Sequence, residues 1–168
     1  MKKVVIIGPE CTGKSTLTQA LAKHFKASFI NEYAREYINQ LGRDYNELDI
    51  LTIAKGQIQL EDSHATKSNL LFLDTDLLVC KVWSEFKYGR CHPWIVEQIE
   101  HRHYDHYLLC DIDLPWHDDG QREHPNHRRE LFDIYQNELK KYNKSYSIVS
   151  GPDRFKFSLN LLQSKLLK

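Results

Sequence analysis

Near its start the chain reads Val4-Val5-Ile6-Ile7-Gly8-Pro9-Glu10-Cys11-Thr12-Gly13-Lys14-Ser15-Thr16. Residues 8–15 match the pattern G-x-x-x-x-G-K-[ST] of a phosphate-binding loop, or P-loop. The β-branched residues before the loop are typical of a buried parallel strand, which we expect at 3–7. After the loop, apolar residues recur at the spacing of an amphipathic helix, expected at 14–24. Strand, loop and helix thus occur in the required order, and the sequence predicts binding of a nucleoside triphosphate.

The loop residues have distinct expected roles toward ATP and Mg²⁺. Glycines let the backbone turn its N–H groups toward an anion, and the N-terminus of the next helix adds partial positive charge. Lys14 would contact the β- and γ-phosphates, and the Ser15 hydroxyl would coordinate Mg²⁺. We therefore assign nucleotide binding to Gly8, Pro9, Glu10, Cys11, Thr12, Gly13, Lys14, Ser15 and Thr16.

Length and composition predict one cytoplasmic domain, residues 1–168. This length suits a single domain with a sizeable core. The 23 basic residues balance the 23 acidic ones, so no bulk charge favours a nucleic acid or an anionic membrane as partner. No apolar run approaches the roughly 20 residues of a membrane span. The four cysteines are scattered, and free cysteines together with an ATP site indicate the cytosol.

Beyond the loop, the patterns of strands and helices alternate. Short apolar runs predict further strands at 27–30, 70–74, 107–110 and 147–149, and helices are expected at 36–41, 46–64, 77–86, 93–103, 130–142 and 153–167. The alternation predicts an α/β P-loop NTPase fold, in which helices flank a parallel β-sheet of about five strands. The polar segment 111–129, which contains two prolines, is expected to form a mobile lid.

Polar residues follow the predicted strands, and the ligands of a parallel sheet bind at that edge. They are Glu32, Tyr33 and Arg35 after the second strand, and Asp74 and Asp76 after the third. Asp74 ends an apolar run, as in a Walker B strand, and is assigned to the hydration shell of Mg²⁺. Asp76 or Glu32 would orient an attacking hydroxyl and accept its proton. Helix capping is the alternative role for such carboxylates.

The lid supplies the other expected groups. An arginine from a closing segment stabilises charge on a transferring phosphoryl group, and closure excludes water. We assign Arg122 to this catalytic role. The acceptor is expected to bind against Glu32, Tyr33, Arg35, Asp76, Trp116 and Asp119. The histidines of the chain match no spacing of a zinc site.

Four blocks of sequence, in this order, resemble the kinase domain of the NadR family. They are 8–15, Glu32-Tyr33-Ala34-Arg35-Glu36-Tyr37, Leu73-Asp74-Thr75-Asp76 and Pro115-Trp116-x-x-Asp119-Gly120-x-Arg122. The resemblance implies a kinase that uses ATP to phosphorylate nicotinamide riboside to nicotinamide mononucleotide in NAD salvage. In similar kinases the loop after the last strand lies beside the P-loop, which implies adenine near 151–154 and a contact from Arg154. Bifunctional members also carry a DNA-binding module and an adenylyltransferase domain, for which this chain has no room.

Other functions remain open at this point. Another nucleoside or nucleotide kinase would share the loop and the carboxylates, and an ATP-binding regulatory switch would share the loop alone. Family members place an aromatic residue in the helix before the Walker B strand, where this chain reads Gln57-Ile58-Gln59-Leu60-Glu61. Because a pyridinium ring binds well against aromatic faces, Tyr33 becomes the candidate stacking residue. Carboxylates and aromatic residues after the strands favour a kinase over a switch.

Overall fold

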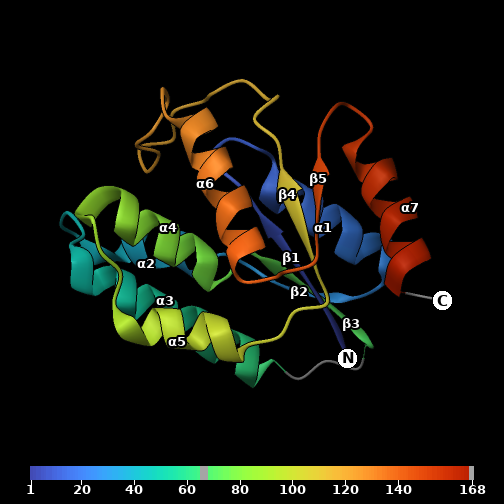
Figure 1. Ribbon diagram of the computed structural model, residues 1–168, viewed down its shortest axis with the longest axis horizontal. Helices are drawn as coiled ribbons and strands as arrows, with labels where there is room; N and C mark the ends of the chain where they lie inside the picture. Colours follow the sequence, from blue (N-terminus) through green and yellow to red (C-terminus); the bar gives the residue numbers. More distant parts are fainter. Residues whose placement is uncertain (65–67, 167–168) are drawn as a thin grey trace.

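A five-stranded parallel sheet forms the centre of the molecule (Figure 1). This computed structural model describes residues 1–64 and 68–166. The strands are β1 (Lys2–Ile7), β2 (Ser28–Ile30), β3 (Leu70–Asp74), β4 (His106–Cys110) and β5 (Tyr146–Val149), in the order β2-β3-β1-β4-β5. Every neighbouring pair is parallel, and β1 lies between β3 and β4. The predicted parallel sheet is confirmed, and the P-loop leaves its central strand.

Helices cover both faces of the sheet. They are α1 (Lys14–Phe25), α2 (Tyr33–Leu41), α3 (Glu47–Ser63), α4 (Leu77–Tyr88), α5 (Pro93–His101), α6 (Arg128–Lys141) and α7 (Arg154–Leu166). Figure 1 shows α1 and α7 on one face and α2 to α6 on the other. Since side chains of a strand alternate between faces, Val4 and Ile6 of β1 pack into the core on the side of α1 and α7. Val5 and Ile7 pack into the core on the opposite side. Within the described residues, none of these helices has the length and apolar character needed to cross a membrane.

The predicted bounds agree with the observed ones within two residues except at α2, which begins at Tyr33 and not at 36. Glu32 is its extended N-cap residue, and the backbone N–H of Tyr33 donates to Gln57 Oε1 of α3 (2.8 Å). This contact comes from a residue distant in sequence, so the local pattern does not reveal it. The predicted end of the last helix, at 167, lies outside the described residues.

The segment 111–127, which we call the lid, connects β4 to α6 without helix or strand. It lies at the carboxyl end of the sheet, near the start of α1 (Figure 1). The P-loop, the lid and the first turns of α2 and α4 therefore share one edge of the molecule, where the predicted site residues can be compared directly. The mobility expected for the lid stays a prediction.

Candidate nucleotide and acceptor site

Two glycines allow the P-loop to curl over the end of β4. Gly8 has φ +143°, and a Cβ atom there would lie 2.7 Å from the carbonyl oxygen of Cys110. Gly13 has φ +76° and is the N-cap residue of α1, a helix of 12 residues. The loop therefore ends on a helix N-terminus, where backbone N–H groups and the helix dipole favour a phosphate group.

Lys14, Ser15 and Asp74 lie together at this loop. Lys14 Nζ donates a hydrogen bond to the Pro9 carbonyl oxygen (2.8 Å). Burial raises the pKa of Asp74, while hydrogen bonding with Ser15 and the charge of Lys14 act in the opposite direction. Asp74 Oδ1 is buried and has no hydrogen-bond partner within the described part of the chain. A partnerless buried carboxylate oxygen beside a serine hydroxyl fits the oxygen ligands and water shell of Mg²⁺.

A cavity of about 240 Å³ adjoins the P-loop. Residues 8–16 of the loop form one side of it. The remaining lining comes from α2, α4, the lid and α6, and comprises Glu32, Ala34, Arg35, Ile38, Val79, Val82, Trp83, Phe86, Gln121, Arg122, Glu123, His124, Leu131 and Tyr135. The cavity thus combines charged groups beside the P-loop with apolar and aromatic groups from α4 and α6. That combination suits a small organic molecule with one polar, reactive end.

Glu32 reaches this cavity from the N-cap position of α2. The Gln57 side chain fixes the turn, because it accepts from the Tyr33 N–H on one side and donates to the Asn31 carbonyl oxygen (3.4 Å) on the other. Burial is the main cause of a raised pKa for Glu32, and Lys14 opposes that shift. A carboxylate with a raised pKa at the phosphate end of a cavity is well suited to accept a proton from a bound hydroxyl.

Asp76 does not line the cavity, which contradicts the prediction that it projects toward the acceptor. It is 3% exposed, and its Oδ2 accepts a hydrogen bond from the Tyr107 hydroxyl (2.7 Å). Its Oδ1 accepts from the Leu78 backbone N–H (3.1 Å), so Asp76 is the N-cap residue of α4. Both oxygens are therefore used inside the protein, and the capping alternative describes this residue.

The aromatic wall differs from the expected one. Tyr33 and Trp116 are absent from the cavity lining. The Tyr33 ring packs against α3 instead, so closely that a Cβ atom on Gly56 would lie 2.2 Å from it. The aromatic residues that do line the cavity are Trp83, Phe86 and Tyr135. Val79, Val82, Trp83 and Phe86 recur at helical spacing, and this stripe on α4 was the available sequence signal.

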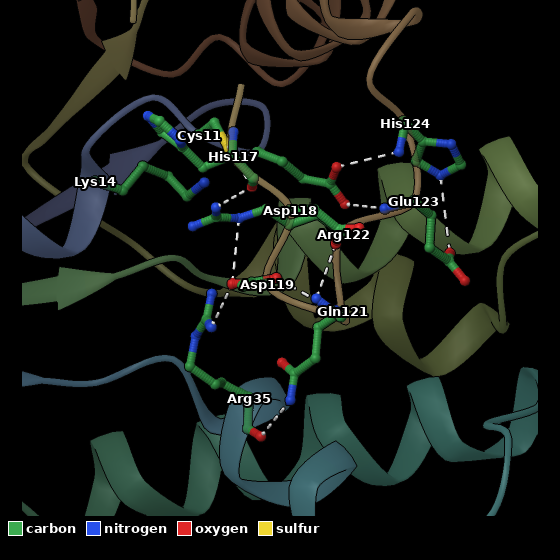
Figure 2. Close-up of polar contacts among 12 residues, drawn as sticks. Cys11, Lys14, Arg35, His117, Asp118, Asp119, Gln121, Arg122, Glu123 and His124 are labelled. Carbon is green, nitrogen blue, oxygen red and sulfur yellow. Dashed lines mark hydrogen bonds and ion pairs between the residues drawn. The ribbon is translucent and has the colours of Figure 1, made fainter. Parts of the chain in front are cut away.

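Asp119 joins an arginine of α2 to an arginine of the lid (Figure 2). Arg35 Nη1 lies 2.8 Å from Asp119 Oδ2, and Arg122 Nε lies 3.3 Å from the same oxygen. Both arginines line the cavity, whereas Asp119 does not. Asp119 holds one guanidinium from α2 and one from the lid, and its contact with the acceptor stays a prediction.

The lid rests directly on the P-loop. The two carboxylate oxygens of Glu10 accept hydrogen bonds from the backbone N–H groups of Glu123 and His124, each at 3.2 Å. Cys11 Sγ lies 3.2 Å from both the backbone nitrogen and the carbonyl oxygen of His117. Figure 2 shows Arg122 extending from the lid between the side chains of Lys14 and Asp119. The loop and the lid thus form one continuous wall.

A second cavity, of about 480 Å³, lies at Gly13 and the loop that follows β5. It is lined by Gly13, Thr16, Leu17, Ala20, Asp113, Leu114, Gly151, Pro152, Arg154 and Phe155. Arg154 Nη1 donates to the Thr12 carbonyl oxygen (2.6 Å), and Nε donates to the Gly151 carbonyl oxygen (3.2 Å). Arg154 thereby ties the loop after β5 to the P-loop, next to a mainly apolar pocket that suits a planar base.

Residues 3–154 match a protein-family model described as an AAA domain. The trifunctional NAD biosynthesis/regulator protein NadR of Escherichia coli is 33% identical over 129 residues, and so is that of Salmonella typhimurium. Each match covers 73% of this chain and 31% of the relative, so the chain spans about a third of the length of these curated proteins.

Solved structures show the same fold. NadR in complex with NR has a TM-score of 0.88 at 23% identity, covering 99% of this chain and 52% of that one. NadR in complex with NAD and AMP-PNP has a TM-score of 0.84 at 22% identity, covering 99% and 50%. Deoxyadenosine kinase from M. mycoides has a TM-score of 0.67 at 15% identity, covering 96% and 99%. The fold is that of the P-loop kinases, and by the match over residues 3–154 the chain belongs to the AAA domain family, with a sequence similar to that of NadR.

Proposed function

We propose that the chain, residues 1–168, is a single kinase domain that uses ATP to phosphorylate the 5′-hydroxyl of nicotinamide riboside. The product would be nicotinamide mononucleotide. The observation that carries this proposal is the cavity of about 240 Å³ beside the P-loop, which is lined by Glu32, Arg35 and Arg122 together with aromatic residues of α4 and α6. A regulatory switch needs a nucleotide site alone, whereas a phosphoryl acceptor needs such a space. The similarity to NadR, which was solved with NR bound, supports the choice of nucleoside.

We assign the ATP phosphates to the backbone N–H groups of 8–16 and to Lys14, and the adenine to the cavity near 151–154. The complex of NadR with AMP-PNP supports a nucleotide of this kind. Ser15 and Asp74 would hold Mg²⁺, and the partnerless Oδ1 of Asp74 supports that assignment. When bound, the metal would neutralise part of the charge on the phosphate oxygens.

We assign proton transfer to Glu32. The 5′-hydroxyl oxygen would attack the γ-phosphorus as the bond from that phosphorus to the leaving oxygen breaks, and the hydroxyl proton would pass to the Glu32 carboxylate. Because the transition state is loose, the proton leaves late, and a carboxylate can accept it at that stage. Lys14, Arg35 and Arg122 would stabilise the charge on the transferring group, and the closed lid would exclude water.

The cavity wall supports a cationic ring as acceptor. Trp83 and Phe86 offer aromatic faces to this space. A pyridinium ring is attracted to such faces. Trp83 and Phe86 would supply the stacking surface that the sequence led us to expect from Tyr33.

A coupled assay of ADP release across a panel of nucleosides tests the proposed function. Nicotinamide riboside should raise the rate well above its basal value, and Lys14→Ala should lower the stimulated rate by orders of magnitude while circular dichroism stays unchanged. A higher rate with a deoxynucleoside or a nucleoside monophosphate would identify a different kinase. Tight ATP binding with a rate that no nucleoside alters would identify a regulatory switch.

A further inference from the structure

The hydroxyl group of Tyr45 connects three segments behind the cavity wall. Tyr45 lies in the loop between α2 and α3 and is half-buried. Its hydroxyl donates to Glu123 Oε2 of the lid, and it accepts from Trp83 Nε1 of α4 (2.9 Å) and from Lys87 Nζ. A tyrosine hydroxyl has one donor and two acceptor positions, so all three are used here. Lys87 Nζ also lies 2.9 Å from Glu123 Oε1.

Two of the three partners of Tyr45 line the cavity, although Tyr45 and Lys87 do not. Trp83 forms part of the aromatic wall and Glu123 part of the lid. The backbone of Glu123 in turn donates to the P-loop residue Glu10 (3.2 Å). A continuous set of contacts therefore runs from the wall, through the Tyr45 hydroxyl and the lid, to the loop that carries the phosphate site.

We propose that Tyr45 is a positioning residue that couples the acceptor-binding wall to lid closure by holding Trp83 and Glu123 through one hydroxyl group. This inference rests on the proposed function, because it requires an acceptor that packs against Trp83. An acceptor ring on the indole restricts its orientation, the restricted indole fixes the Tyr45 hydroxyl, and the fixed hydroxyl holds Glu123 in the closed lid. Acceptor and nucleotide thereby strengthen each other's binding.

The charges around the hydroxyl favour this closed arrangement. Burial and the neighbouring Glu123 raise the pKa of Tyr45 to about 12, so the hydroxyl keeps its proton and can donate. The hydrogen bond from Tyr45 and the charge of Lys87 outweigh burial and lower the pKa of Glu123, so its carboxylate is charged near neutral pH. A hydrogen bond to a charged group is stronger than one between neutral groups, which makes this contact a suitable latch.

The variant Tyr45→Phe removes all three hydrogen bonds and keeps the ring. The matched control is Tyr37→Phe, which removes a hydroxyl that donates to Asp49 Oδ1 (2.8 Å) near the start of α3. Calorimetric binding of AMP-PNP with and without nicotinamide riboside gives the coupling between the two ligands. We expect the nucleoside to tighten nucleotide binding at least fivefold in the wild type and in Tyr37→Phe, and less than about twofold in Tyr45→Phe.

Hydrogen exchange at the backbone N–H groups of Glu123 and His124 provides a readout that needs no nucleoside. With AMP-PNP bound, exchange there should be about tenfold faster in Tyr45→Phe than in Tyr37→Phe, because Glu123 loses the hydrogen bond from Tyr45 and keeps only its ion pair with Lys87. A double-mutant cycle with Glu123→Gln should show non-additive loss of coupling, which a general loss of stability would not produce.

The outcomes separate this inference from the proposed function. Unchanged coupling and unchanged lid exchange in Tyr45→Phe would overturn the positioning role. If the wild type neither binds nor phosphorylates any nucleoside, the proposed function fails and acceptor coupling fails with it. In that case, faster lid exchange in Tyr45→Phe would support the anchor between Tyr45 and Glu123, and unchanged exchange would overturn it.

Discussion

Glu32 and Asp76 illustrate how two carboxylates at the same edge of a sheet acquire different roles. Both follow strands, and both have a pKa that burial raises. Glu32 lines the cavity near Lys14, whereas Asp76 directs both oxygens to groups of the protein interior. A group that transfers a proton must reach the substrate, so geometry decides between them before pKa does.

Glu32→Gln should therefore lower the nucleoside-dependent kcat/KM by about 10²-fold or more, the scale for a lost acid–base group. Asp76→Asn should change kcat/KM far less, since the amide oxygen can still cap α4 and the amide N–H₂ group can donate to the Tyr107 hydroxyl, which then acts as the acceptor. Single-turnover phosphorylation and calorimetric ATP binding on both variants would check this order. A larger catalytic loss in Asp76→Asn than in Glu32→Gln would identify Asp76 as the general base.

For single residues, the sequence predicted which side chains lie near the phosphate site better than it predicted where those side chains point. Spacing placed Glu32, Arg35 and Arg122 near the phosphate end, and all three line the cavity; their catalytic roles stay predictions. Spacing could not show that the Tyr33 ring turns toward α3 or that Asp76 turns inward. Side-chain direction after a strand depends on the neighbouring helix, which a motif does not contain.

The close contact between the P-loop and β4 is possible because Gly8 has no side chain. A Cβ at Gly8 would lie 2.7 Å from a backbone oxygen that a strand holds in place, so the loop itself would have to move. We expect Gly8→Ala to lower the free energy of unfolding by about 2–4 kcal/mol, the combined scale of backbone strain and overpacking. Chemical unfolding measures this loss, and nucleotide affinity should fall with it.

Gly42 provides the control for Gly8. It is the C-cap residue of α2 with φ +68°, and nothing lies within 4 Å of a Cβ built there. Gly42→Ala should therefore cost only the left-handed conformation, about 1–2 kcal/mol, and leave nucleotide binding unchanged. Equal losses in the two variants would mean that conformation alone, and not contact with Cys110, constrains Gly8.

Among the elements, prediction succeeded where the signal was local. The local pattern predicted a helix from residue 46, and the structure shows a capping box of Asn46 and Asp49 at the start of α3. The start of α2 was missed because it depends on Gln57, 24 residues away from Tyr33. The same Gln57 supports the turn that presents Glu32 to the cavity.

Over the whole molecule, both faces of the sheet are covered, which is why the strands read as nearly continuous apolar runs. The alternation of strands and helices therefore predicted the fold class, although it did not determine the strand order. The same burial places a few titratable groups in the interior, and their titration makes the free energy of unfolding rise with pH in one case and fall with pH in another. His106 and Asp76 are the clearest pair.

His106 is 1% exposed in β4, and its two ring nitrogens lie 2.9 Å from Ser145 Oγ and 3.0 Å from Ser147 Oγ. Burial, and to a lesser degree the charge of Lys165, lower its pKa from 6.5 to about 4. Between these values the unfolded chain binds the proton and the folded chain does not. This contribution to stability is therefore complete above pH 6.5 and is lost as the pH falls toward 4.

Asp76 acts in the opposite direction, because its pKa is raised from 3.8 to about 6 and the folded chain binds its proton more readily. The pH dependence of the wild type contains both effects, so the informative quantity is a difference between variants. The glutamine of His106→Gln can hydrogen-bond to both serines but does not titrate. Urea unfolding from pH 4 to 7 should show the wild type gaining about 3 kcal/mol relative to His106→Gln as the pH rises. A difference that stays constant over this range would mean that His106 is protonated equally in the folded and unfolded states.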